Sequence, residues 1–264
     1  MPARFPVSSP PTAYSDFTAA YIFGSDNALL VDPAGRSDEI TTALRERNAA
    51  HVAVTHHHPD HVGAVSYYAS EFDLTVWCRT GRQSQFESAT GCTPDRTFSH
   101  GTVLPVAGGV EVYDTPGHAP EHVGFIASHG DQTVLVSGDL VVAEGTVVVG
   151  SPEGDVRAYL SSLRRVLARD FDRLLPSHGP VIADTRATCR RLIEHRLRRE
   201  KLVLAAVRDG IDRPPAIVEK IYEKDVMDVY DLALATVVAH LEKLDVEGTV
   251  EWDGDLARPG DVLT

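Results

Sequence analysis

Residues 54–64, VTHHHPDHVGA, bring His56, His57, His58, Asp60 and His61 together within six consecutive positions. Imidazole and carboxylate groups are ligands for zinc and other first-row metals, and histidine-rich tracts typically bind metal. The tract follows an apolar segment typical of a buried strand and precedes a segment with helical spacing. A loop between a strand and a helix is a common place for functional groups, so the sequence predicts a metal site here.

The spacing inside the tract predicts how its side chains divide. In an extended segment, residues two apart point the same way, so His56 and His58 are expected to share a face while His57 points away. Pro59 keeps the residue before it extended. Asp60 and His61 then start the next helix and can face the same cavity from a second direction. This arrangement offers two ligand pairs at two nearby points, as two adjacent cations would require.

Two coordination spheres need more ligands than this tract supplies. Three candidates each follow an apolar strand in a glycine-containing loop: His118 in VYDTPGHAPEH, Asp139 in VLVSGDL and His178 in LLPSHGPVI. His122, four residues after His118, is expected either to support the site or face the substrate, or else to be hydrogen-bonded within the core. The remaining histidines are expected to be structural or exposed.

The combined pattern resembles the metallo-β-lactamase superfamily. It comprises HxHxDH (His56, His58, Asp60, His61), then GH (His118), GD (Asp139) and HG (His178), and it extends over nearly all of the first 184 residues. The resemblance implies an α/β fold, an αββα sandwich with a dinuclear site at one edge of its two sheets. It assigns His56, His58 and His118 to one metal, Asp60, His61 and His178 to the other, and Asp139 to a bridge between them.

The resemblance also implies a metal-dependent hydrolase with two divalent cations, expected to be Zn²⁺, although the same ligands accept Mn²⁺ or iron. Such a pair lowers the pKa of a water molecule, so that hydroxide can attack a carbonyl carbon or a phosphorus atom. Asp60 is the expected catalytic residue, because it could orient that nucleophile or carry its proton.

Within the superfamily, the chain is most similar to the β-lactamase-like protein 2 group and its bacterial relatives. The similarity is carried by TPGHAPEHVGF, SGDLVVAEGT, LLPSHGPVI and EHRLRREK. It implies hydrolysis of an ester, thioester or lactone of a small molecule, and the alternatives are a single-stranded RNA endoribonuclease and a glyoxalase II-like thioesterase. A non-catalytic winged-helix DNA-binding protein is a further alternative, disfavoured because the ligand set is complete.

The net charge and the cysteine content indicate which kinds of partner and which compartment suit the chain. The net charge of −13 over 264 residues disfavours a general nucleic-acid binder, which needs a positive surface. One stretch is basic, with Arg186, Arg190, Arg191, Arg198 and Arg199 as a possible anion-binding stripe or simply a solvated helix face. Three widely spaced cysteines fit a reducing cytoplasm better than a disulfide framework, and no apolar run is long enough to span a membrane.

The pattern of the whole chain predicts the elements that must hold these ligands. Strands are expected over residues 19–23, 28–31, 51–55, 74–78, 102–106, 109–115, 122–128, 133–137, 145–150, 172–177 and 248–252, and helices over 38–47, 62–72, 155–168, 185–208, from 214, and over 229–244. Ser37 is the expected N-cap of the first helix. We therefore expect a catalytic domain over residues 1–184 and a small winged-helix-like helical domain over residues 185–264.

Overall fold

The computed structural model describes residues 1–8, 17–222 and 229–260, which form two compact units. The first unit contains the described residues of Met1–Thr115, Glu121–Gly145 and Asp170–Thr185. The second contains Pro116–Pro120, Thr146–Arg169 and the described residues from Arg186 onward. Two internal segments thus group with the C-terminal helices, whereas the predicted division at residue 184 was linear. Whether residues 1–184 and 185–264 fold as separate domains stays a prediction.

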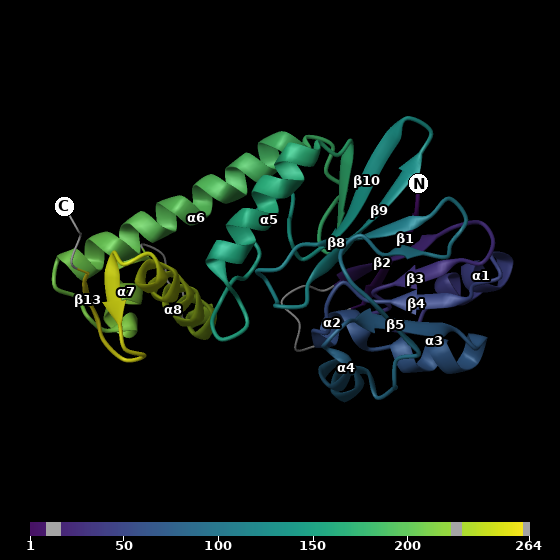
Figure 1. Cartoon of the computed structure of the whole chain (residues 1–264), viewed down its shortest axis with the longest axis horizontal. Coiled ribbons are helices and arrows are strands. Elements are labelled where there is room, and N and C mark those ends of the chain that lie inside the picture. The colour runs from purple at the N-terminus through teal and green to yellow at the C-terminus, as the bar shows by residue number, and fades with distance from the viewer. Residues whose placement is uncertain (9–16, 223–228, 261–264) are drawn as a thin grey trace. The chain divides into compact units, whose positions relative to one another are not determined.

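The first unit contains a six-stranded sheet with strand order β1-β2-β3-β4-β5-β6 (Figure 1). Its strands are β1 (Ala3–Ser8), β2 (Phe17–Phe23), β3 (Leu29–Val31), β4 (His51–Ala53), β5 (Thr75–Arg79) and β6 (Arg96–Phe98). The β1, β2 and β3 strands pair antiparallel, and β3 to β6 pair parallel. Parallel pairing brings the carboxyl ends of β3 and β4 to the same edge, and the histidine tract follows β4.

A second sheet of five strands has the order β11-β10-β9-β8-β7. Its strands are β7 (Val103–Leu104), β8 (Val110–Asp114), β9 (Val123–His129), β10 (Gln132–Gly138) and β11 (Arg173–Pro176). All neighbours pair antiparallel except β10 and β11, which are parallel. The carboxyl ends of β10 and β11 therefore lie together, and they lead directly to Asp139 and His178.

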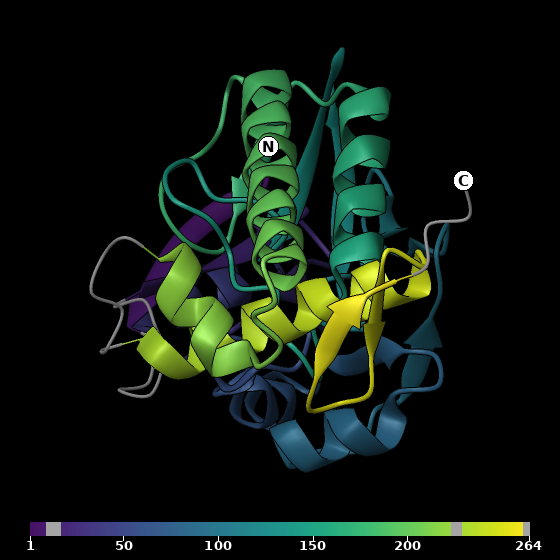
Figure 2. The ribbon, with the colours of Figure 1, turned by 90° about the vertical axis from the view of Figure 1, so that its left-hand side faces the viewer.

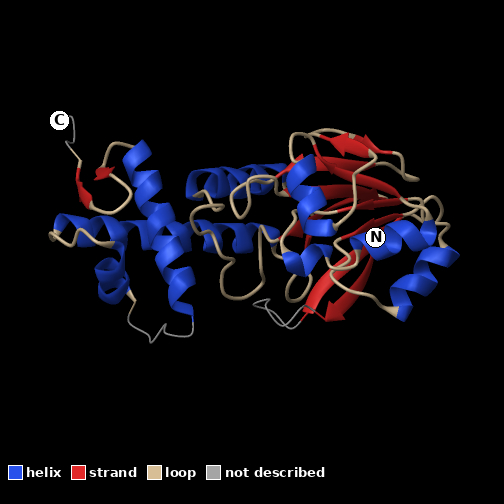
Figure 3. Ribbon diagram, turned by 90° about the horizontal axis from the view of Figure 1, so that it is seen from below, coloured by secondary structure: helices blue, strands red, loops and turns tan. Residues whose placement is uncertain are grey.

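The two sheets pack face to face through one apolar core. Tyr21, Leu29 and Phe98 of the first sheet pack with Phe125 and Val136 of the second, and the rings of Phe98 and Phe125 meet edge to face at 6.0 Å. The opposite face of the first sheet is covered by helices of the same unit, shown in Figure 3. These helices are α1 (Asp38–Glu46), α2 (Pro59–Val62), α3 (Val65–Phe72) and α4 (Gln83–Thr90).

The second unit is mainly helical, as Figure 2 shows. It contains α5 (Val156–Arg169), α6 (Thr185–Arg208, whose first residue belongs to the first unit), α7 (Pro214–Ile221), α8 (Tyr230–Val246) and a hairpin of β12 (Val250–Trp252) and β13 (Ala257–Pro259). Its core is built from Val203, Val207, Ile217, Val237 and Leu241. Three helices followed by a hairpin agree with the expected order, but winged-helix character stays a prediction.

Local signals account for the agreement and for the errors. Ser37 caps α1 by accepting a hydrogen bond from the backbone N–H of Ile40, as predicted. The single helix predicted over residues 62–72 is broken into α2 and α3. At the break, a Cβ on Gly63 would lie 2.3 Å from the Ala34 carbonyl oxygen, so only glycine allows this close approach.

The strand predicted over residues 145–150 is wrong, because this segment is a loop. Its backbone carbonyls do not enter a sheet. The Val147 and Val148 carbonyl oxygens instead accept hydrogen bonds from the side chains of Arg196 and His118. The β1, α4, β6 and β13 elements were not predicted, since they are short or lack a clear apolar period.

Candidate metal centre

The histidine tract lies where β4 leaves the sheet and α2 begins. His56 and His61 are buried, while His58 and Asp60 are partly exposed. The His56 Nε2 atom lies 3.0 Å from the His58 Nδ1 atom, and their rings meet edge to face. His58 is the extended residue before Pro59, and Pro59 opens α2. The local chain thus brings His56 and His58 together, as the extended spacing predicted.

Asp60 and His61 form a second cluster with Asp139 and His178. The His61 Nε2 atom lies 3.5 Å from Asp139 Oδ1 and 4.0 Å from Asp60 Oδ2. The His178 Nε2 atom lies 3.3 Å from Asp139 Oδ1 and 3.5 Å from Asp60 Oδ2. Two imidazoles and two carboxylates from three separate stretches of chain therefore point at one small volume.

These ligand atoms form two overlapping groups of a size that suits a metal ion. In one group, His56, His61 and Asp139 place a ligand atom each within 4.8 Å of one another. In the other, Asp60, His61 and His178 do the same. His61 belongs to both groups, so the two candidate positions are adjacent.

The histidines and carboxylates of the cluster shift one another's pKa values. Burial alone would lower the pKa of His61, but the carboxylates of Asp139 and Asp32 outweigh it and raise that pKa well above its usual value. Burial opposes a charge on His178 too, yet hydrogen bonds to Asp139 and Asp60 raise its pKa to about 10. Burial would raise the pKa of Asp60, but the hydrogen bond from His178 leaves it lowered. The acids therefore favour positive charge in the site.

The donor set fits divalent cations. Imidazole and carboxylate are borderline and hard ligands that together suit zinc, manganese or iron. His61 Nε2 is buried and has no hydrogen-bond partner among the residues that the structure describes. An imidazole nitrogen buried in this way is suited to donate its lone pair to a metal.

Asp32, which the sequence interpretation missed, holds His61 from behind. It is fully buried, and its Oδ2 atom lies 3.0 Å from His61 Nδ1. It also accepts hydrogen bonds from the Thr55 backbone N–H at 2.7 Å and the Thr55 hydroxyl at 2.8 Å. A carboxylate on one ring nitrogen orients the other nitrogen toward a metal. The signal was present, because LLVDPAG is also an apolar strand followed by a polar residue and a glycine.

His122 supports Asp139 and offers no ring nitrogen to a metal here. Its Nδ1 atom lies 2.8 Å from the Thr115 hydroxyl, and its Nε2 atom accepts a hydrogen bond from the Asp139 backbone N–H at 3.0 Å. Among the roles expected for this buried residue, the contacts agree with support for the backbone of a candidate ligand.

His57 makes two contacts with Glu121. Its Nδ1 atom lies 3.0 Å from the carboxylate of Glu121, which also accepts a hydrogen bond from the His57 backbone N–H at 3.3 Å. Glu121 is buried. His57 does point away from the ligand cluster as expected, but its pairing with Glu121 ties the tract to the strand end near β9.

Hydrogen bonds with β1 and β2 hold His178 and the residues next to it in place. Its Nδ1 atom donates to the Phe17 carbonyl oxygen at 3.0 Å, which leaves Nε2 toward the two carboxylates. The Tyr21 hydroxyl donates to the Pro176 carbonyl at 2.7 Å, and Arg4 donates both to that hydroxyl and to the Gly179 carbonyl. The loop that carries His178 is thus fastened to β1 and β2.

His118 lies in Pro116–Pro120, which groups with the second unit. Its Nδ1 atom donates to the Val148 carbonyl oxygen at 2.7 Å. Gly117, with φ +136°, packs so closely against Tyr159 that a Cβ would lie 2.3 Å from the Tyr159 Cα. Pro116 follows Thr115 and Pro120 precedes Glu121, and both of these flanking residues belong to the first unit. The assignment of His118 as a metal ligand stays a prediction.

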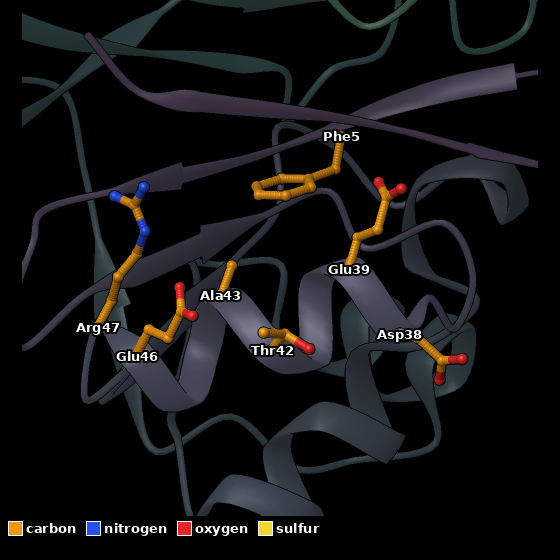
Figure 4. Close-up of a pocket in the computed structure, with 7 residues that line it drawn as sticks. All are labelled: Phe5, Asp38, Glu39, Thr42, Ala43, Glu46 and Arg47. Carbon is orange, nitrogen blue, oxygen red and sulfur yellow. The ribbon is translucent and has the colours of Figure 1, made fainter.

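The cavity beside α1 and the basic stretch of α6 contain none of the candidate metal ligands. A cavity of about 490 Å³ beside α1 is lined by Phe5, Asp38, Glu39, Thr42, Ala43, Glu46 and Arg47 (Figure 4), none of which belongs to the ligand cluster. Within the described part of the chain, no helix is long and apolar enough to cross a membrane. Of the predicted arginine stripe, Arg186, Arg190 and Arg198 are exposed on α6, and Arg199 stacks over the ring of Tyr222 at 3.9 Å.

Comparison with known proteins points to one superfamily. Residues 15–178 match the metallo-beta-lactamase superfamily. A beta-lactamase-like protein 2 homolog of Drosophila melanogaster is 27% identical over 88% of this chain and 83% of its own length. The hydroxyacylglutathione hydrolase GloC of Haemophilus influenzae is 28% identical over 66% of this chain and 85% of its own. An atrochrysone carboxyl ACP thioesterase of Aspergillus chevalieri is 30% identical over 73% of this chain and 61% of its own.

Solved structures give the same fold. A metallo-beta-lactamase family protein of Thermus thermophilus superposes with a TM-score of 0.76, covering 98% of each chain at 22% identity. A protein crystallised in a di-iron-bound form superposes with a TM-score of 0.55, covering 68% of this chain and 94% of its own at 28% identity. The predicted fold class and the predicted enzyme class are thereby confirmed, and the chain belongs to the metallo-beta-lactamase superfamily as a metal-binding hydrolase.

Proposed function

We propose that this chain is a dinuclear hydrolase. His56, His58 and His118 are proposed to hold one divalent ion, Asp60, His61 and His178 the other, and Asp139 both. The observation that carries the proposal is the convergence of His61 and His178 on the carboxylates of Asp60 and Asp139, at 3.3 to 4.0 Å. Zinc is the proposed metal, while manganese and iron suit the same donors, and the di-iron neighbour keeps iron as the main competitor.

When bound, such ions polarise a substrate carbonyl and lower the pKa of a water molecule so that it can attack near neutral pH. The chain supplies orientation and proton transfer. Asp60 is partly exposed, with its side chain 18% accessible, and its lowered pKa keeps it ionised at neutral pH. We assign to Asp60 the role of orienting the attacking water and accepting its proton. Asp32 and His122 hold His61 and Asp139 in place.

The proposed substrate is a small molecule with a thioester, ester or lactone bond, and thioesters are the first choice. Support comes from two relatives whose names describe thioester hydrolysis, the hydroxyacylglutathione hydrolase and the ACP thioesterase. A glyoxalase II-like activity is the second candidate, carried by the former. The comparisons give no support to an RNA substrate, although the resemblance to the β-lactamase-like protein 2 group implied one.

A substrate panel with a matched variant tests the proposal. Protein loaded with Zn²⁺, Mn²⁺ or Fe²⁺ is offered acyl-CoA, acyl-glutathione, lactone and aryl ester substrates, and single-stranded RNA. We expect thioester hydrolysis that chelator abolishes and that falls by about 10² to 10⁴ in Asp60→Asn. Asp38→Asn, an exposed carboxylate on α1, is the control and should retain full activity.

Two results would contradict this proposal. If the wild-type protein binds less than one metal ion per chain after loading, the proposed metal centre is wrong. If the protein cleaves RNA and turns over no ester or thioester, the proposed substrate class is wrong, but the proposed metal centre is not contradicted.

A further inference from the structure

Arg196 is a buried arginine on α6 without an acidic partner. Its side chain is 2% exposed, and no carboxylate of the described residues pairs with it. Burial of a charged group without a counter-ion is costly, and here it lowers the pKa of the guanidinium.

The contacts of Arg196 join α6 to residues 146 and 147. Its Nη2 atom donates to the Thr146 hydroxyl at 3.0 Å and to the Val147 carbonyl oxygen. The guanidinium also lies 5.5 Å from the ring centre of Tyr159 on α5, which runs beside α6 (Figures 1 and 2). Both hydrogen bonds start from one rigid –NH₂ group of the planar guanidinium, which holds the two acceptors of the loop at a more fixed angle than the rotating ammonium of a lysine would. Arg196 therefore fixes residues 146 and 147, the segment wrongly predicted to be a strand.

The next residue of this loop orients His118. The Val148 carbonyl oxygen can only accept a hydrogen bond, so at 2.7 Å it requires the proton of His118 to be on Nδ1. The Nε2 atom then carries the lone pair that a metal ligand needs. The other side of the His118 loop is fastened to α5, since the Ser162 hydroxyl donates to the Pro116 carbonyl at 2.8 Å and the Asp155 N–H donates to the Gly117 carbonyl at 2.9 Å.

We infer that Arg196 is a positioning residue for His118, acting through the 146–148 loop. The chain of contacts runs from the guanidinium to Thr146 and Val147, and from the adjacent Val148 carbonyl to the imidazole, entirely within the second unit. This inference rests on the proposed function, because His118 must be a metal ligand for its orientation to matter. It gives α6 a part in metal binding that the ligand motif does not reveal.

Metal binding itself, measured apart from activity, tests the inference. Wild type, Arg196→Met, Arg196→Lys and Thr146→Val are stripped of metal and titrated with Co²⁺, and affinity is measured by competition with a chelator. Arg199→Met is the matched control, since Arg199 lies on the same helix but stacks over Tyr222. Thermal unfolding of the metal-free proteins establishes that each variant is folded.

We expect Arg196→Met to weaken Co²⁺ binding by about 10- to 100-fold, the usual effect of removing a group that orients a ligand. The visible d–d spectrum of the bound Co²⁺ should also change, because one imidazole ligand would be displaced. Arg196→Lys and Thr146→Val should show smaller losses in the same direction, and Arg199→Met should match wild type.

Two outcomes overturn the inference. If Arg196→Met does not fold, Arg196→Lys and Thr146→Val decide, and affinity within twofold of wild type in the folded variants would refute a positioning role. The proposed function would survive that result. If wild type itself takes up less than one Co²⁺ per chain, the proposed function and the inference fail together.

Discussion

The Oδ2 atom of Asp32 lies 3.0 Å from the Nδ1 atom of His61, and both side chains are fully inaccessible to solvent. Asp32 adopts a left-handed backbone conformation, with φ +52°, that few non-glycine residues adopt. Its carboxylate accepts hydrogen bonds from Thr55 as well, so it ties the end of β3 to the start of the histidine tract. Asp32 therefore connects the end of β3 to the ligand cluster through its hydrogen bonds with Thr55 and His61.

The first prediction concerns Asp32→Asn, which keeps the shape and removes the charge. We expect metal affinity to fall by about 10- to 100-fold, because the His61 imidazole loses the carboxylate that orients it and raises its basicity. Chelator competition measures the affinity, and Asp38→Asn on the exposed face of α1 is the control. Unchanged affinity in a folded Asp32→Asn protein would show that His61 is oriented without Asp32.

The second prediction is that metal affinity rises with pH. In the metal-free protein the pKa of His61 is raised well above its usual value and that of His178 to about 10, so both rings hold protons at neutral pH. A metal displaces these protons, and binding that releases protons strengthens as pH increases. Calorimetric titration between pH 6 and pH 8, in buffers of different ionisation enthalpy, should detect the release. Affinity independent of pH would contradict it.

The third prediction uses Gly138, which joins β10 to Asp139. A Cβ at this position, where φ is +52°, would lie 2.5 Å from His122 Nε2 and 2.9 Å from the Thr55 Cβ. We expect Gly138→Ala to lower the free energy of unfolding by about 3 kcal/mol, from backbone strain plus overpacking, and to weaken metal binding.

Gly130→Ala is the matched control for that substitution. Gly130 also has a positive φ, +60°, but nothing lies within 4 Å of the added Cβ, so only the backbone strain of about 1 kcal/mol applies. Metal affinity should be unchanged in the control. Equal losses in the two variants, measured by denaturant unfolding and chelator competition, would show that the contact with His122 is unimportant.

The fourth prediction concerns His240, which is buried in α8 of the second unit. Its pKa is lowered to about 3, first by burial and then by the nearby cations Arg196, Arg199 and Lys243. The unfolded chain binds a proton near pH 6.5 and the folded chain does not, so stability is full above pH 6.5 and is lost as pH falls toward 3.

Between pH 6.5 and pH 5 this linkage should remove on the order of 2 kcal/mol from the free energy of unfolding of the unit. His240→Leu should flatten that slope, whatever its effect on stability at pH 7. Denaturant unfolding of the metal-free protein from pH 5 to pH 8 measures the slope. An equal slope in both proteins would assign the acid sensitivity to other groups.

The ligand types and their order were determined by the sequence by itself. The spacing of HxHxDH is a local property, because an extended segment and a helix start place neighbouring side chains at defined angles whatever surrounds them. The apolar strands before His118, Asp139 and His178 are local as well, as are the caps and glycines that punctuate them. These signals carry the resemblance to the metallo-β-lactamase superfamily, and that resemblance predicted the fold class and a metal-binding hydrolase correctly.

The partners of these residues were decided only by the tertiary structure. Asp32 and His61 are 29 positions apart, and His57 and Glu121 are 64 positions apart. Their pairing depends on which strands are neighbours and in which register, and no local pattern encodes that. The same reason explains the loop at 145–150. Its valines read as a strand, but its carbonyls bind Arg196 and His118 from distant segments, and those long-range hydrogen bonds outweigh the local β-propensity.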